Sequence, residues 1–152
     1  MPYKYSDEVN GLTESNGNAC FINYSEKETI AYRWVFAPIE DPKNFIPIAK
    51  DEHTSLKKKC SGWALSFHET EDASKASWEH FINMKPNKYK KIGTHIAEGK
   101  IFKTDGKCSE SDANLHFNLI EYKDVNPKTN FTIKRQLITD EELESLQNSN
   151  EK

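Results

Sequence analysis

The chain has 152 residues, of which 36% are hydrophobic and 30% charged, and its net charge is −3. This length suits one compact domain, 1–152, whose core we expect to be rich in the 17 aromatic residues. The small negative charge argues against a nucleic acid partner, and the absence of any run of ~18 apolar residues argues against a membrane-spanning helix.

The first half of the chain predicts an arm, two strands and a loop. Residues 1–18 are polar and include Gly11 and Gly17, which is typical of a flexible arm unless aromatic side chains anchor it. The β-branched and aromatic run at 29–36 predicts a strand that ends before Pro38. Prolines prevent a helix over 38–47, and residues 62–67 predict a buried strand.

A central helix is predicted over about 70–84. Thr70 suits the N-cap, and Glu71 and Asp72 lie in the first turn, where the helix dipole favours acidic residues. Pro86 follows the end of the helix. Residues at spacings of three and four predict the face that packs on the sheet: Ala73, Ala76, Ser77, His80, Phe81 and Met84.

Further strands are predicted over 94–102, with a bulge at Gly99, and around 115–122 and 131–137. Thr139 and Glu142 form a capping box before a short C-terminal helix, which we expect to fray over 148–152. Strands and helices do not alternate as parallel sheets require. We therefore expect an α+β fold in which a mainly antiparallel, twisted sheet packs against one central helix.

The three cysteines, Cys20, Cys60 and Cys108, are widely and unequally spaced. This pattern predicts neither a disulfide framework nor a zinc site. The odd number, and an amino terminus without an apolar leader, favour the cytoplasm. Lysines at 57–59 would lower the pKa of an exposed Cys60 thiol, which makes Cys60 a candidate reactive group, although a buried thiol is the alternative.

Charge is unevenly distributed along the chain. Residues 50–103 hold 11 basic and 7 acidic side chains, whereas both flanking thirds are net acidic. This predicts either a solvated mixed surface or a basic patch for a phosphate or an acidic partner. The 13 asparagines and 19 lysines, against two arginines, suggest an AT-rich coding sequence and hence a bacterium or a phage.

No catalytic or cofactor motif is present: the chain has no Gly-x-Ser-x-Gly, no Walker A loop and no His-Glu-x-x-His. We therefore expect no metal and no cofactor. Three histidines on or beside predicted strands could still meet in space, together with a carboxylate, and Trp63 could serve as an aromatic anchor. The candidate ligand-binding residues are His68, Trp63, His95 and His116.

One order of residues resembles the ADP-ribosyltransferase superfamily. Arg33 lies on an early predicted strand, Ser66 ends the next one, and Glu98 and Glu121 lie on later strands. The resemblance implies that Arg33 contacts the phosphates of NAD, that Ser66 supports the nicotinamide pocket, and that Glu121 or Glu98 is the catalytic acid. An anion beside the developing cation fits this chemistry. The motifs that accompany these residues in the family, a Ser-Thr-Ser run and a paired Glu-x-Glu, are absent.

Without a catalytic motif, the main expectation is a small cytosolic binding module that recognises a protein or a small ligand. Aromatic anchors surrounded by charge, such as Trp34, Trp63 and Trp78, suit such an interface, although tryptophans in so polar a chain also suit the core. The alternative is an NAD-using enzyme that contains Arg33 and Ser66. Whether these residues meet in one cleft decides between the two hypotheses.

Overall fold

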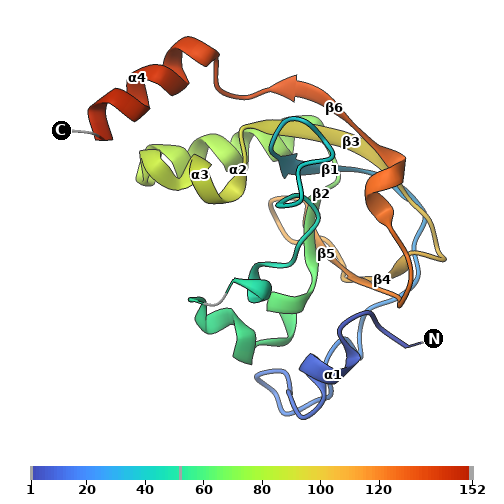
Figure 1. Ribbon diagram of the computed structural model, residues 1–152. Helices are drawn as coiled ribbons and strands as arrows, with labels where there is room; N and C mark the ends of the chain where they lie inside the picture. The colour runs from blue at the N-terminus through green and yellow to red at the C-terminus, as the bar shows by residue number, and fades with distance from the viewer. Residues whose placement is uncertain (1, 52, 151–152) are drawn as a thin grey trace.

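The computed structural model describes residues 2–51 and 53–150 and contains one six-stranded sheet (Figure 1). The strand order is β4-β5-β2-β1-β3-β6, and all neighbouring strands are antiparallel. The predicted α+β class is therefore confirmed. The strands are β1 (Thr29–Val35), β2 (Leu65–His68), β3 (His95–Ile101), β4 (Gly106–Cys108), β5 (His116–Glu121) and β6 (Phe131–Gln136).

The central helix is α2 (Glu71–Met84), and it packs against β1, β2 and β3. Thr70 caps it as predicted, because its side chain accepts a hydrogen bond from the Ala73 amide. The predicted packing face is wrong, since the buried residues are Ser74 and Trp78, while Met84 is 66% exposed. Both faces fit the helical period, and the Trp78 indole, which donates to the Gly93 carbonyl at 2.9 Å, determines which one is buried.

The remaining helices are short or terminal. At the C-terminal helix, the Thr139 hydroxyl accepts from the Glu142 amide at 3.1 Å, as expected for the capping box. This helix includes residues 148–150 of the expected frayed tail, and 151–152 lie outside the described residues. The helices are α1 (Ser6–Val9), α3 (Tyr89–Ile92) and α4 (Asp140–Asn150), with five 3₁₀ turns named η1 to η5.

The bulge predicted at Gly99 is wrong. Strand β3 runs through Gly99 without a break, and its register against β6 shifts between Ile96 and Ala97 instead. A Cβ on Gly99 would lie 2.4 Å from a ring carbon of Phe131. The glycine is therefore needed for the close approach of that ring.

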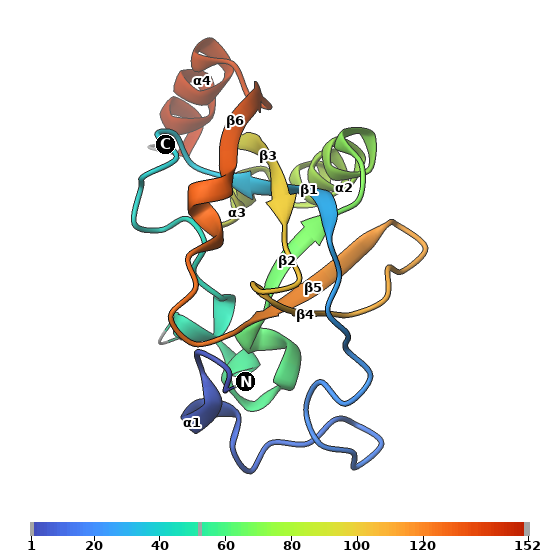
Figure 2. The ribbon, with the colours of Figure 1, turned by 90° about the vertical axis from the view of Figure 1, so that its right-hand side faces the viewer.

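Residues 2–25 pack against the rest of the fold (Figure 2). Tyr3 pairs with Tyr122 just beyond β5, and the two rings stack at 5.9 Å. Ser25 exchanges two backbone hydrogen bonds with Cys108, which covers the outer edge of β4. Tyr5 is buried beside Trp63, with ring centroids 5.5 Å apart. These contacts anchor the segment in which a flexible arm was expected.

The two faces of the sheet carry different side chains because neighbouring residues of a strand point to opposite sides. The inner face holds the main core, including Ala31, Val35 and Phe67, and Phe45 of the loop after β1 packs against it. The outer face holds Tyr32 and Trp34, and α2 lies over it where the Trp34 indole donates to the Ser74 carbonyl at 3.0 Å.

The loop between β1 and η1 (Ile48–Lys50) is held by one amide side chain. Asn44 is only 6% exposed, accepts from the Phe36 amide at 2.7 Å, and donates to the carbonyls of Phe36, Pro38 and Ile39. Four hydrogen bonds from one buried side chain fix the path of the loop across the inner face.

Across the described ranges, no helix is both long and apolar enough to cross a membrane.

Candidate functional site

The four residues predicted as catalytic separate into two pairs on opposite faces of the sheet. Tyr32 lies opposite both His68 and Glu98, so Ser66 and Glu98 share the outer face with it. Arg33 follows Tyr32 and therefore lies on the inner face. Glu121 follows Phe117 and Leu119 at even spacing along β5, and both of these belong to the inner core. Arg33 and Glu121 thus share one face, and Ser66 and Glu98 share the other.

Arg33 is a partly exposed cation between two aromatic rings. Its Cζ lies 5.4 Å from the centroid of the Phe45 ring and 5.7 Å from that of Phe67. Its Nη1 donates to the backbone carbonyl of Ser66 at 2.9 Å, so the only contact with Ser66 is through the main chain. Among the described residues, its Nε is buried without a hydrogen-bond partner. Burial lowers the pKa of Arg33 to about 10.

Arg33 also has no carboxylate partner within 4.0 Å in the described part of the chain. Arg135 is different, because its Nε and Nη2 both donate to Oε2 of Glu71, at 3.2 and 2.8 Å. Of the two arginines, one is therefore neutralised by an acidic side chain and the other is not.

Glu121 is the second charged group of the inner face. It is 2% exposed, and its Oε2 accepts from Nζ of Lys4 at 2.6 Å, while the same Nζ donates to the Val125 carbonyl at 2.8 Å. Burial raises the pKa of Glu121, and Lys4 and Arg33 oppose that shift. Its Oε1 is buried and, among the described residues, has no hydrogen-bond partner. Buried polar atoms without partners are rare, and they mark places where a ligand or water can bind.

The outer-face carboxylate, Glu98, has two partners at one of its oxygens, Oε2. It accepts from the Tyr32 hydroxyl at 2.7 Å and from Nζ of Lys134 at 3.0 Å. These two hydrogen bonds lower the pKa of Glu98. The hydrogen bond between Tyr32 and Glu98 also raises the pKa of Tyr32 to about 12. Ser66 is exposed nearby on the same face. The pairing of Glu98 explains its position without any reacting group.

Two of the predicted ligand-binding histidines lie together on the outer face. His68 is 5% exposed, and its ring lies between those of Trp34, at 5.4 Å, and His116, at 5.5 Å. Burial, with a smaller effect of His116, lowers the pKa of His68 to about 4, and burial also lowers the pKa of His116. Within the described residues, no three His, Cys, Asp or Glu side chains are placed to hold a metal ion.

The other two predicted ligand-binding residues lie elsewhere. His95 begins β3, its Nδ1 is 2.8 Å from the Thr94 hydroxyl, and it borders an open cleft of about 460 Å³ between the loop after β1, α3 and α4. Trp63 is buried against Tyr5 in a separate core, and its indole donates to the Lys57 carbonyl at 3.1 Å. The four residues therefore do not form one site.

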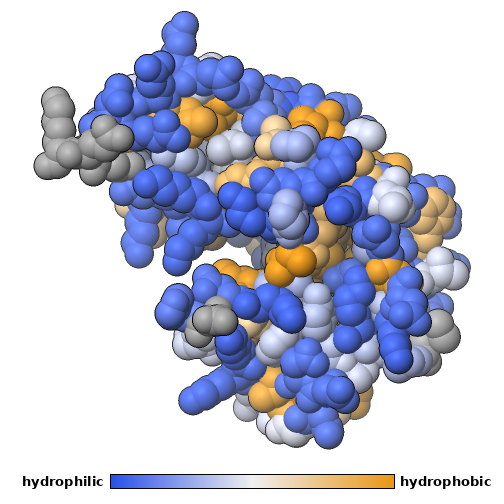
Figure 3. Space-filling view, in the orientation of Figure 1, coloured by the Kyte–Doolittle hydropathy of each residue, from blue (hydrophilic) through white to orange (hydrophobic). Residues whose placement is uncertain are grey.

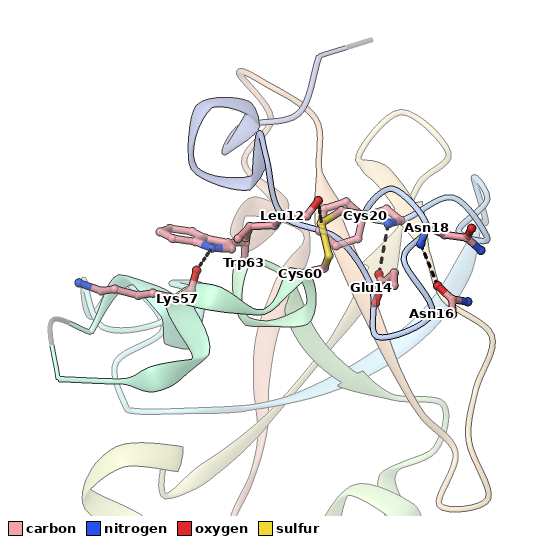
Figure 4. Close-up of a disulfide and its surroundings, with 9 residues drawn as sticks. Leu12, Glu14, Asn16, Asn18, Cys20, Lys57, Cys60 and Trp63 are labelled. Atoms are coloured by element: carbon pink, nitrogen blue, oxygen red, sulfur yellow. Dashed lines mark hydrogen bonds between the residues drawn. A yellow bond between two sulfur atoms is a disulfide. The ribbon is translucent and has the colours of Figure 1, made fainter.

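Cys60 is not a free thiol. Its sulfur is bonded to that of Cys20, which attaches the N-terminal segment to the turn before β2 (Figure 4). The prediction of no disulfide is wrong, because the chain between the two cysteines, which are 40 positions apart, folds back and brings their Cα atoms to 5.5 Å. Cys108 is buried, and burial raises the pKa of its thiol to about 11. Since disulfides are typical of oxidising compartments, the cysteine content no longer favours the cytoplasm.

Sequence reasoning missed three residues that shape the inner face. Lys4 was part of the expected arm, and Phe45 and Asn44 lay in a loop interpreted only as ordered. The available signal was an apolar residue, Phe45, next to a polar one in a proline-rich segment, but no local pattern indicates which strand such a loop crosses.

No protein-family model, no curated protein and no solved structure matches this chain. The functional argument therefore rests on the geometry of its own residues.

Proposed function

We propose that the protein is a small binding module whose ligand site is centred on Arg33 and takes a carboxylate or phosphate group. One observation carries the proposal: Arg33 is a partly exposed cation whose Nε is buried without a hydrogen-bond partner, and it forms no salt bridge among the described residues. A charge taken out of water without a counter-ion costs free energy, and an anionic ligand would restore that energy.

The surroundings of Arg33 suit a planar or tetrahedral anion. A guanidinium presents its donors in a fixed fork that matches carboxylate and phosphate oxygens. The rings of Phe45 and Phe67, at 5.4 and 5.7 Å from Cζ, help to hold the guanidinium in place. Glu121 acts on Arg33 as a nearby opposite charge but forms no salt bridge with it, and Oε2 of Glu121 is already paired with Lys4.

The test is a thermal-shift titration with phosphate, pyrophosphate and succinate. At about ten times the dissociation constant, a bound anion should raise the melting temperature by about 3–5 °C. The shift should disappear in Arg33→Gln and persist in Arg135→Gln, which removes the paired arginine. Equal shifts in both variants would place binding elsewhere and overturn the proposal.

A second candidate function is the NAD-using, ADP-ribosyltransferase-like enzyme. What supports it is that Arg33 and Glu121 share the inner face, as a phosphate anchor and an acid would. Ser66 and Glu98 lie on the outer face, so this version assigns no role to their side chains. NAD at millimolar concentration should then stabilise the protein, and nicotinamide should be released by wild type but not by Glu121→Gln. Stabilisation by pyrophosphate without nicotinamide release leaves the binding module as the function.

The cytoplasmic location and the bacterial or phage origin stay predictions from composition.

A further inference from the structure

Two lysine runs that are distant in the sequence approach each other across a hollow in the surface. The first run is Lys57, Lys58 and Lys59, at η2 (Ser55–Lys58) and the residue after it. The second is Lys88, Lys90 and Lys91, at the end of η4 (Pro86–Lys88) and in α3. Figure 3 shows this hollow between the part of the molecule that holds α2, α3 and α4 and the lower part, with hydrophilic surface on both rims.

The two runs lie close enough to act on one carboxylate. Asp51 follows η1, which packs against η2, and its pKa is lowered first by the His53 amide and then by the charges of Lys91 and Lys57, among others. One lysine from each run therefore contributes to the field at the same residue. Together with the hollow in Figure 3, this indicates that the two runs, called the two banks below, border the same part of the surface.

The charge of this surface is only partly offset within the described residues: Asp51 lies near both runs, and Lys90 shares a cleft with Asp41 and Asp140. None of the six lysines takes part in a salt bridge there, although other lysines of the chain, such as Lys4 and Lys134, do. Residues 53–68 and 80–97, which contain the two runs, have no acidic side chain. All six lysines are at least partly exposed. An excess of like charges at a shared hollow attracts an anionic partner and accelerates its association.

The chemistry of the banks favours a protein over a nucleic acid. The aromatic rings closest in sequence, Trp63 and Tyr89, are 7% and 4% exposed, so neither offers a face on which a base could stack. Each bank instead carries an exposed aliphatic side chain: Ile48 is 52% exposed beside η2, and Met84 is 66% exposed before α3. Charged rims around apolar anchors are typical of protein interfaces.

We propose that the two lysine runs form one docking surface for an acidic segment of a partner protein that also carries apolar side chains. This surface does not include Arg33, and the proposal holds whether or not a small anion binds there. Carboxylates of the segment pair with lysines of both banks, and its apolar residues contact Ile48 and Met84.

The experiment is fluorescence anisotropy with a labelled peptide of about twelve residues, glutamates with two leucines, which in extended form reaches across both banks. The variants are K57Q/K58Q/K59Q and K88Q/K90Q/K91Q. The matched control is K103Q/K123Q/K128Q, which removes three lysines that form no salt bridge among the described residues and lie in other turns. Circular dichroism confirms that each variant is folded.

We expect each bank variant to weaken peptide binding about fivefold or more at low salt, and the control to change it less than about twofold. An all-glutamate peptide should bind more weakly than the one with leucines. Equal binding by the bank variants and the control overturns the proposal, as does a loss from one bank alone. Tighter binding of a single-stranded oligonucleotide that depends on the same lysines would replace the protein partner by a nucleic acid.

Discussion

The inner and outer faces of the sheet carry charged groups in different environments. On the outer face, Glu98 has two hydrogen-bond donors, and on the side covered by α2, Arg135 is paired with Glu71. On the inner face, Arg33 has no acidic partner within the described residues, whereas a buried carboxylate oxygen without a partner occurs on both sides, at Oε1 of Glu121 and Oε1 of Glu71. A charged side chain whose partners lie within the protein has a structural role that requires no ligand. The difference therefore directs the functional question to the inner face.

The largest expected effect comes from opening the disulfide that anchors the N-terminal segment, and with it Lys4. In the Cys20→Ser/Cys60→Ser variant, loss of a loop of 40 residues should lower the free energy of unfolding by up to about 4 kcal/mol. Hydrogen exchange should rise at Tyr5 and Glu121 more than at Tyr32. Equal loss of protection at all three residues would mean that the disulfide stabilises the whole fold rather than the inner face in particular.

The two lysine–glutamate pairs provide the next comparison. Lys4→Ala leaves Glu121, 2% exposed, without its cation, and should destabilise the fold by about 2–3 kcal/mol. Lys134→Ala removes the cation from Glu98, whose side chain is 34% exposed, and should cost about 0–1 kcal/mol. Urea denaturation at neutral pH measures both costs. Similar values for the two variants would contradict the contrast between the faces.

The contributions of Glu121 and Glu98 to stability should change with pH in opposite directions. The folded pKa of Glu121 is raised by burial, so its contribution to stability is full below the unfolded pKa and is lost as pH rises through the folded pKa. The folded pKa of Glu98 is lowered by its hydrogen bonds, so its contribution is present above the unfolded pKa and is lost as pH falls through the folded pKa.

Urea unfolding of wild type, Glu121→Gln and Glu98→Gln between about pH 4 and 7 tests this sign. From low to high pH, the stability of wild type relative to Glu121→Gln should fall, and that relative to Glu98→Gln should rise. Parallel curves for the two variants would show that the carboxylates do not differ in environment.

The smallest effect is expected at Ser66. Its side chain is exposed on the outer face, and Arg33 contacts only its carbonyl. Ser66→Ala should therefore change stability by less than about 0.5 kcal/mol and leave anion binding unchanged. A tenfold loss of anion affinity would assign the hydroxyl to the ligand site and favour the ADP-ribosyltransferase-like reading.

Local patterns predicted much of the fold but little of the site. The capping residues Thr70 and Thr139, and the alternating strand at 131–137, are local signals, and the helices and strands follow them. Strand alternation places Arg33 and Ser66 on opposite faces only when the register that pairs Tyr32 with His68 is known, and the sequence does not provide that register. The Cys20–Cys60 bond and the Lys4–Glu121 pair join residues 40 and 117 positions apart. Such pairs follow from tertiary folding, and no short window of sequence contains them.

The central claim is that Arg33, and not Arg135, is the arginine available to an anion. Because the chain has two arginines, its guanidinium Nε–H nuclear magnetic resonance spectrum should contain two signals, which Arg135→Lys assigns. During a pyrophosphate titration, the Arg33 signal should shift and saturate, while the Arg135 signal, held by Glu71, should stay in place. A shift of the Arg135 signal alone, or equal and non-saturating shifts of both, would contradict the account.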